Sequence, residues 1–167
     1  MKRVMIVGGP GSGKSTMAVA LGQITGLPVF HMDHIHYRPG WVEREPGEKL
    51  RLAAEIHARD RWIFEGGLSK SYSERAVRAD TVIWLDLPLR LRYGRIVKRR
   101  IEYNGRSRAD LPDDCPERLD PAFLAFMFRT RNSARAAIAK ALSEHPQVHH
   151  IRTAKGVDTF LDWCRLG

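Results

Sequence analysis

The sequence predicts a three-layer α/β fold in which helices cover both faces of a parallel sheet. Short apolar runs alternate with helical patterns along the 167 residues, which is typical of a parallel sheet. One such run, Val4–Val7, leads directly into residues 8–15, Gly-Gly-Pro-Gly-Ser-Gly-Lys-Ser, which match the pattern G-x-x-x-x-G-K-S/T. A helical pattern begins immediately after this loop. Strand, glycine-rich loop and helix in this order predict a nucleotide-binding α/β domain.

The remaining elements follow from hydrophobic patterns and from residues that start or stop helices. The expected strands are residues 2–7, 28–31, 62–65, 81–85 and 148–151, and the expected helices are residues 14–25, 46–59, 71–77, 88–103, 120–142 and 157–165. Gly26 and Pro28 end the first helix, while Asp120 and Pro121 form a cap and first turn for the longest one. Residues 104–119 are polar and lack periodicity, which predicts a mobile lid.

Length and composition predict a single domain that spans residues 1–167. No apolar stretch is long enough to span a membrane, and no signal-peptide pattern is visible, so we expect a soluble cytoplasmic protein. Cys115 and Cys164 are expected to be reduced thiols. The formal net charge is +9, and most of the 28 basic residues are arginine, which favours phosphate groups as ligands.

The glycine-rich loop has the chemistry of a phosphate-binding site. Its glycines allow positive φ angles, so that backbone N–H groups at the start of a helix can surround a phosphate. The predicted nucleotide-binding residues of this segment are Gly8, Gly9, Pro10, Gly11, Ser12, Gly13, Lys14, Ser15 and Thr16. Lys14 is expected to reach the β- and γ-phosphates of ATP, and the Ser15 hydroxyl to bind Mg²⁺.

Three further segments resemble the nucleoside monophosphate kinases. Residues 33–41 lie where those kinases begin their acceptor-binding region, and residues 62–69 resemble their acid–glycine segment. Residues 82–88, followed by Arg95 and Arg99, resemble the strand, proline and arginine-bearing helix that lead into the adenylate kinase lid. The resemblance implies a five-stranded parallel sheet of order 2-3-1-4-5, ATP and Mg²⁺ as cofactors, an acceptor-binding insertion at about residues 33–60 and a lid at about residues 104–119.

Residues 37–41 and 115–119, Tyr-Arg-Pro-Gly-Trp and Cys-Pro-Glu-Arg-Leu, most resemble the adenylate kinase-related proteins described as DNA topology modulation (FlaR-like) proteins. Two features depart from adenylate kinases. Residues 66–69 are Gly-Gly-Leu-Ser and lack the arginine that binds the acceptor phosphate there, and the lid lacks the four cysteines of the zinc-bearing enzymes. The acceptor can therefore be a nucleotide or a small molecule with a hydroxyl group.

Phosphoryl transfer requires converging cations and a group that orients the acceptor. Beside Lys14, the candidates are Arg95 and Arg99, which share a helical face with Arg92, and Arg131, which is four residues before Arg135. The alternative for these arginines is a solvated basic face. Asp33 is the candidate for orienting the acceptor or acting as its base, and capping of a helix is its alternative.

Magnesium placement is assigned to Ser15 and Glu65, because Glu65 ends a strand expected to neighbour that of the loop. Asp86 also follows an apolar strand. Its two alternative roles are to place magnesium or to cap the helix that follows. Lys155 follows the last strand, where related kinases contact the adenine of ATP. His31, His34 and His36 flank Asp33, but ordinary histidines beside a phosphate pocket are favoured over metal ligands.

Two functions fit these observations. The first is a kinase that transfers the γ-phosphate of ATP to a nucleoside monophosphate or another small acceptor. The alternative is a DNA-binding or regulatory ATPase, which the basic composition favours, although no recognisable nucleic-acid-binding motif is present.

Overall fold

In the computed structural model, which describes residues 1–103, 106, 110–116 and 120–166, five parallel strands form one central sheet. The strands are β1 (Arg3–Gly8), β2 (Val29–His31), β5 (Trp62–Glu65), β6 (Thr81–Leu85) and β7 (Val148–Ile151). Their spatial order is β2-β5-β1-β6-β7, which is 2-3-1-4-5 when only the strands of this sheet are counted. Each neighbouring pair is parallel, so the predicted topology is confirmed.

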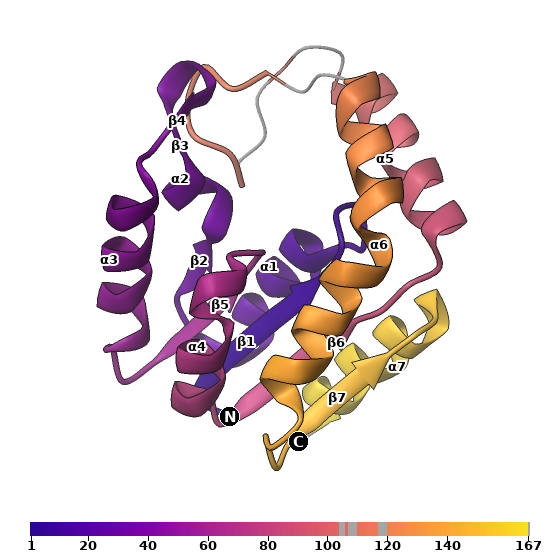
Figure 1. Cartoon of the computed structure of the whole chain (residues 1–167). Coiled ribbons are helices and arrows are strands. Elements are labelled where there is room, and N and C mark those ends of the chain that lie inside the picture. Colours follow the sequence, from indigo (N-terminus) through magenta and orange to yellow (C-terminus); the bar gives the residue numbers. More distant parts are fainter. Residues whose placement is uncertain (104–105, 107–109, 117–119, 167) are drawn as a thin grey trace.

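Helices lie on both faces of this sheet (Figure 1). They are α1 (Lys14–Thr25), α2 (Met32–His36), α3 (Pro46–His57), α4 (Tyr72–Arg78), α5 (Leu89–Tyr103), α6 (Pro121–Leu142) and α7 (Ala154–Leu166), with short 3₁₀ turns at Pro39–Trp41 and Ser69–Ser71. The side chain of Asp120 accepts a hydrogen bond from the backbone N–H of Ala122 at 2.8 Å, so the predicted cap of α6 is present.

Successive residues of β1 point to opposite faces of the sheet, and two hydrophobic cores result. Met5 and Val7 face the side of the sheet that α3, α4 and α6 cover, and they pack in one cluster with Phe64 and residues of these helices. Val4 and Ile6 pack with α1 and α7 on the other face. Both faces of β1 are buried, which explains why its sequence is continuously apolar rather than alternating.

The structure differs from the predicted elements in two places that matter for the site. The segment after β2 forms the short helix α2 and a two-stranded hairpin, β3 (Tyr37–Arg38) and β4 (Val42–Glu43), which the sequence pattern did not predict. These elements are too short for a periodic signal. The last helix begins at Ala154, three residues earlier than expected, because the Thr153 hydroxyl accepts the backbone N–H of Gly156 at 3.0 Å.

Among the described residues, no helix has the length and hydrophobicity needed to cross a membrane.

Candidate active site

The glycine-rich loop lies at the carboxyl end of the central strand β1 and continues into α1. Gly11 and Gly13 have φ angles of +74° and +90°, a region that favours glycine. The backbone N–H of Ser12 donates to the carbonyl of Gly9 at 3.2 Å, which closes the loop on itself. Because α1 begins at Lys14, the loop amides lie at a helix N-terminus, where an anion is stabilised.

Lys14 folds back over this loop. Its Nζ donates to the carbonyl oxygen of Gly9 at 3.2 Å. Burial lowers the pKa of Lys14, while the negative charges of Glu65 and Asp33 act against that shift. The ammonium group therefore contacts the loop, and the charges of two carboxylates act on it.

Glu65 connects the loop to the neighbouring strands. It is 3% exposed, and its Oε1 accepts a hydrogen bond from the Ser15 hydroxyl at 3.1 Å and lies 2.9 Å from Nδ1 of His31. Burial disfavours protonated His31, but the hydrogen bond and charge of Glu65 outweigh this effect and raise the pKa of His31. A hydroxyl and a carboxylate side by side are oxygen ligands of the kind that Mg²⁺ prefers, so Ser15 and Glu65 fit the predicted magnesium site.

Asp33 lies on α2, directly after the end of β2. Burial, and then the negative charge of Glu65, raise the pKa of Asp33, whereas Lys14 acts in the opposite direction. A carboxyl group with a raised pKa is a better proton acceptor than an ordinary aspartate when it is ionised. The structure therefore brings Asp33 into the same electrostatic environment as Lys14 and Glu65.

The predicted arginine face of α5 lies against the loop. Arg92 is buried, and its Nη1 lies 1.5 Å from where a Cβ atom at Gly9 would be, so a side chain at Gly9 would displace the Arg92 guanidinium. Arg95 Nη1 donates to the carbonyl of Ser12 at 3.0 Å. The positive charge of Arg99 contributes to the lowered pKa of Lys14, so its charge acts on the lysine of the loop.

Other predicted residues lie elsewhere. Arg131 is exposed and stacks on Phe128 of its own helix, with its guanidinium carbon 4.0 Å from the ring centroid. Arg135 lies four residues further along α6 and forms an ion pair with Asp86 at 2.9 Å. Arg131 and Arg135 therefore contact different partners. Asp86 also lies 3.0 Å from Nε2 of His150. Thr16 and Lys155 are exposed, the latter in the first turn of α7.

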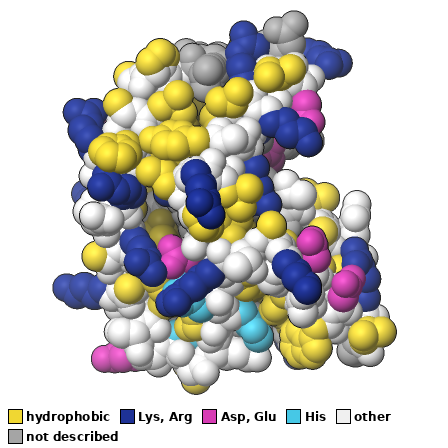
Figure 2. All heavy atoms as spheres, turned by 90° about the vertical axis from the view of Figure 1, so that its right-hand side faces the viewer, with side chains coloured by type: hydrophobic (Ala, Val, Ile, Leu, Met, Phe, Trp, Pro, Cys, Tyr) yellow, Lys and Arg dark blue, Asp and Glu magenta, His cyan; other side chains and the backbone are white. Residues whose placement is uncertain are grey.

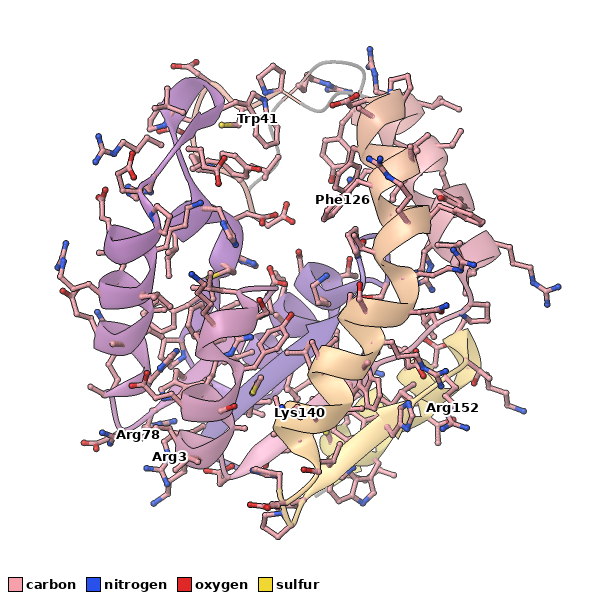
Figure 3. The ribbon with its side chains drawn as sticks, viewed as in Figure 1. Arg3, Trp41, Arg78, Phe126, Lys140 and Arg152 are labelled. Carbon is pink, nitrogen blue, oxygen red and sulfur yellow. The ribbon has the colours of Figure 1, made fainter. Side chains whose placement is uncertain are left out.

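The described part of the predicted lid contacts the hairpin β3–β4. The Trp41 backbone N–H donates to Sγ of Cys115 at 3.3 Å, and the Trp41 indole N–H donates to the carbonyl of Pro116, also at 3.3 Å. Cys115 is fully buried at this contact. In Figure 3, Trp41 and Phe126 of α6 lie on opposite sides of the region above the carboxyl edge of the sheet. Residues 104–105, 107–109 and 117–119 of the predicted lid lie outside the described residues.

Sequence reasoning missed three contacts that only folding creates. It did not connect His31 with Glu65, and it grouped Arg92 with the arginine face without expecting the contact at Gly9. It did not single out Arg75 of α4, which is fully buried and donates from Nη2 to the carbonyl of Gly66 at 2.7 Å. The arginine face had a usable signal in its helical spacing, whereas the two arginines of the short helix α4 carry no signal that tells which one is buried.

Solved structures with the same arrangement of a parallel sheet between helices are similar to this chain over nearly its whole length. The chain is similar to the shikimate kinase of Acinetobacter baumannii in complex with shikimate, with a TM-score of 0.60 and 14% identity over 99% of this chain and 93% of that one. The shikimate kinase of Aquifex aeolicus gives a TM-score of 0.57 with 13% identity over 98% and 94%. An unliganded sugar kinase of Janibacter sp. gives 0.53 with 18% identity over 98% and 94%.

Searches by sequence give a different result. No protein-family model matches the chain, and a search of curated proteins also finds no match. The resemblance to the DNA topology modulation proteins therefore stays a prediction. The strand order, the glycine-rich loop at the end of β1 and the similarity to these solved structures together show that the chain has the same fold as these shikimate and sugar kinases.

Proposed function

We propose that this protein is a kinase that transfers the γ-phosphate of Mg-ATP to a small acceptor. The observation that carries the proposal is the convergence of Lys14, the Ser15–Glu65 pair and Asp33 at the carboxyl edge of the sheet. In open α/β sheets, ligands bind in the crevice outside this edge. The solved structures with this fold include a shikimate kinase and a sugar kinase, which is consistent with a hydroxyl group as the acceptor.

Different residues are proposed to bind the phosphates, to supply positive charge and to contact the adenine. The loop amides and Lys14 are proposed to bind the phosphates, while Arg92, Arg95 and Arg99 supply positive charge beside them. Arg131 is proposed to add positive charge from α6, and Lys155 to lie beside the adenine. In this fold, charge neutralisation and alignment supply most of the rate enhancement, because the protein forms no covalent bond with the transferred group.

Asp33 is proposed to orient the acceptor hydroxyl and take its proton. A carboxylate whose pKa is raised by burial is suited to this step. Ser15 and Glu65 would hold the magnesium ion, which supplies charge neutralisation at the β- and γ-phosphates when it is bound. Glu65 is favoured over Asp86 for this role, because Glu65 contacts the P-loop serine and Asp86 is paired with Arg135 and His150.

The test is ADP release from Mg-ATP with a panel of nucleoside monophosphates, nucleosides, sugars and hydroxy acids. We expect at least one acceptor to raise ADP release well above the rate without acceptor. Lys14→Ala should lower that rate roughly 100-fold or more, because it removes the main cation at the phosphates. Lys140→Ala is the matched control, since Lys140 is an exposed lysine far along α6 from the loop (Figure 3), and it should keep the wild-type rate.

Slow ADP release that no acceptor stimulates would contradict the kinase proposal and favour the DNA-linked ATPase. That alternative is tested by filter binding of DNA at two salt concentrations, because affinity for nucleic acid falls steeply with salt. On the face drawn in Figure 2, lysines and arginines are scattered among apolar side chains, without the continuous basic surface that a nucleic-acid backbone would follow. The kinase proposal expects no DNA binding near physiological salt.

A further inference from the structure

His31 and Glu65 form a pair across two neighbouring strands of the sheet. In the parallel register of β2 and β5 the two residues are direct partners. Glu65 leaves the sheet on the face that α1 covers, because side chains alternate along a strand and Ile63, two residues earlier, packs on that face. Val29 of β2 packs there as well, so His31 points the same way. Register and alternation therefore bring the imidazole to the carboxylate.

The contacts of Glu65 are unevenly divided between its two oxygens. Its hydrogen bonds end on Oε1, which lies 2.9 Å from Nδ1 of His31 and accepts the Ser15 hydroxyl at 3.1 Å. A carboxylate oxygen only accepts, so Nδ1 of His31 is the donor. Oε2 has no hydrogen-bond partner among the described residues, yet it does not belong to the fully buried side-chain atoms that lack a partner there. Oε2 is therefore accessible to solvent.

This arrangement does more than compensate the burial of a charge. Glu65 is 3% exposed, and a buried carboxylate requires hydrogen bonds. If compensation were the whole role of His31, a bond to the oxygen that lacks one would serve it best. Instead the imidazole adds a second bond to Oε1, and the ring itself is largely buried, with 13% of the His31 side chain exposed. The carboxylate is thereby fixed in one orientation, which leaves Oε2 for another ligand.

We propose that His31 is a positioning residue for the magnesium site, which fixes Glu65 through Oε1 and leaves Oε2 for the ion or for a water bound to it. This inference rests on the proposed function, which assigns Ser15 and Glu65 to magnesium. A glutamate side chain has several rotatable bonds, and the entropy lost when they are fixed opposes the binding of an ion. Because His31 fixes them in advance, it raises the affinity for the ion without touching it.

The test measures binding of Mn²⁺ to the complex of the protein with ADP, with no acceptor and no turnover. Mn²⁺ prefers the same oxygen ligands as Mg²⁺, and the EPR signal of free Mn²⁺ reports its concentration. The protein is kept in excess over ADP, so that the nucleotide is bound. His31→Leu removes the donor and should raise the Kd of Mn²⁺ at least about tenfold. His31→Asn places an amide N–H where Nδ1 lies and should bind Mn²⁺ as the wild type does.

The affinity for ADP without metal, measured in EDTA, separates positioning of Glu65 from general damage to the site. It should be equal in the wild type, His31→Leu and His31→Asn, because the phosphate-binding loop is unchanged. If His31→Leu does not fold, His31→Ala, which also lacks the donor, takes its place. In a Glu65→Ala background, the further change His31→Leu should have no effect on Mn²⁺ binding, because the two residues act through one contact.

His145→Leu is the matched control. Nε2 of His145 lies 3.1 Å from the carbonyl oxygen of Ala79, a contact at the opposite, amino edge of the sheet, since the two residues precede β7 and β6. Loss of this contact should leave Mn²⁺ binding unchanged.

The inference is overturned if His31→Leu binds Mn²⁺ as the wild type does, if His31→Asn is no better than His31→Leu, or if metal-free ADP binding falls in parallel. A wild type that binds no Mn²⁺ together with ADP overturns it as well. Binding of Mn²⁺ and ADP does not depend on an acceptor. If the wild type binds both but no acceptor stimulates ADP release, the kinase proposal fails while this inference stands.

Discussion

Replacing His57 should make the protein more resistant to acid. His57 is 2% exposed, and both ring nitrogens lack a hydrogen-bond partner among the described residues, although Nδ1 lies 3.8 Å from Oε1 of Glu74, whose negative charge partly offsets the effect of burial on the pKa of His57. Its ring packs against Trp62 and Phe64, with ring centroids 6.5 and 5.6 Å away. Burial, followed by the positive charge of Arg75, lowers the pKa of His57 from 6.5 to about 4.

The sign of the effect follows from proton binding in the two states. In the unfolded chain His57 takes up a proton near pH 6.5, whereas in the folded protein it stays neutral down to about pH 4. The unfolded state therefore binds more protons between these values, and the folded state loses stability as the pH falls through this window. The difference between the two pKa values corresponds to about 3 kcal/mol of unfolding free energy by pH 4.

The assay is urea unfolding of the wild type and of His57→Leu, which keeps an apolar side chain of similar size between the rings. Near pH 7.5 the leucine variant should differ from the wild type only by its packing, about 1 kcal/mol in either direction. Near pH 4, the unfolding free energy of the variant relative to that of the wild type should be about 3 kcal/mol higher than it is near pH 7.5. His34→Gln serves as the control, because His34 is exposed and should give no such change. Equal acid sensitivity of the wild type and His57→Leu would refute the reasoning.

Three further outcomes are expected. Gly66→Ala should destabilise the protein by at least about 2 kcal/mol in urea unfolding, because its Cβ would lie 2.4 Å from that of Met32 at a φ of +113°. Gly26→Ala, where φ is +65° and the space is open, should lose only about 1 kcal/mol, and equal losses at the two sites would contradict the role of the close contact. Glu65→Gln should lower acceptor-dependent ADP release about 100-fold and raise the magnesium concentration at half-maximal rate; a change in neither would exclude Glu65 from the magnesium site. Asp120→Ala should lower the unfolding free energy by about 1 kcal/mol through loss of the α6 cap, with unchanged ADP release.

Much of the architecture could be predicted because its signals are local. The strands at 62–65, 81–85 and 148–151 and the helix at 14–25 begin and end where the pattern placed them, since apolar runs, glycines and prolines mark these ends. The P-loop was recognisable from eight consecutive residues, because backbone geometry around a phosphate demands that spacing. The small hairpin and α2 were missed, since their few residues carry no period.

The sequence by itself therefore determined the sheet, the phosphate-binding loop and the arginine face of α5. Only the tertiary structure decided which charges meet. Whether Glu65 or Asp86 lies at the loop serine depends on which strands are neighbours and on which face a side chain leaves the sheet, and neither is encoded within a short window. The same holds for Arg75, which donates to the Gly66 carbonyl and lies over the Phe64 ring only because β5 and α4 fold together. Pairing of charges is a property of packing, because electrostatic interactions and desolvation act between residues brought together from distant parts of the chain.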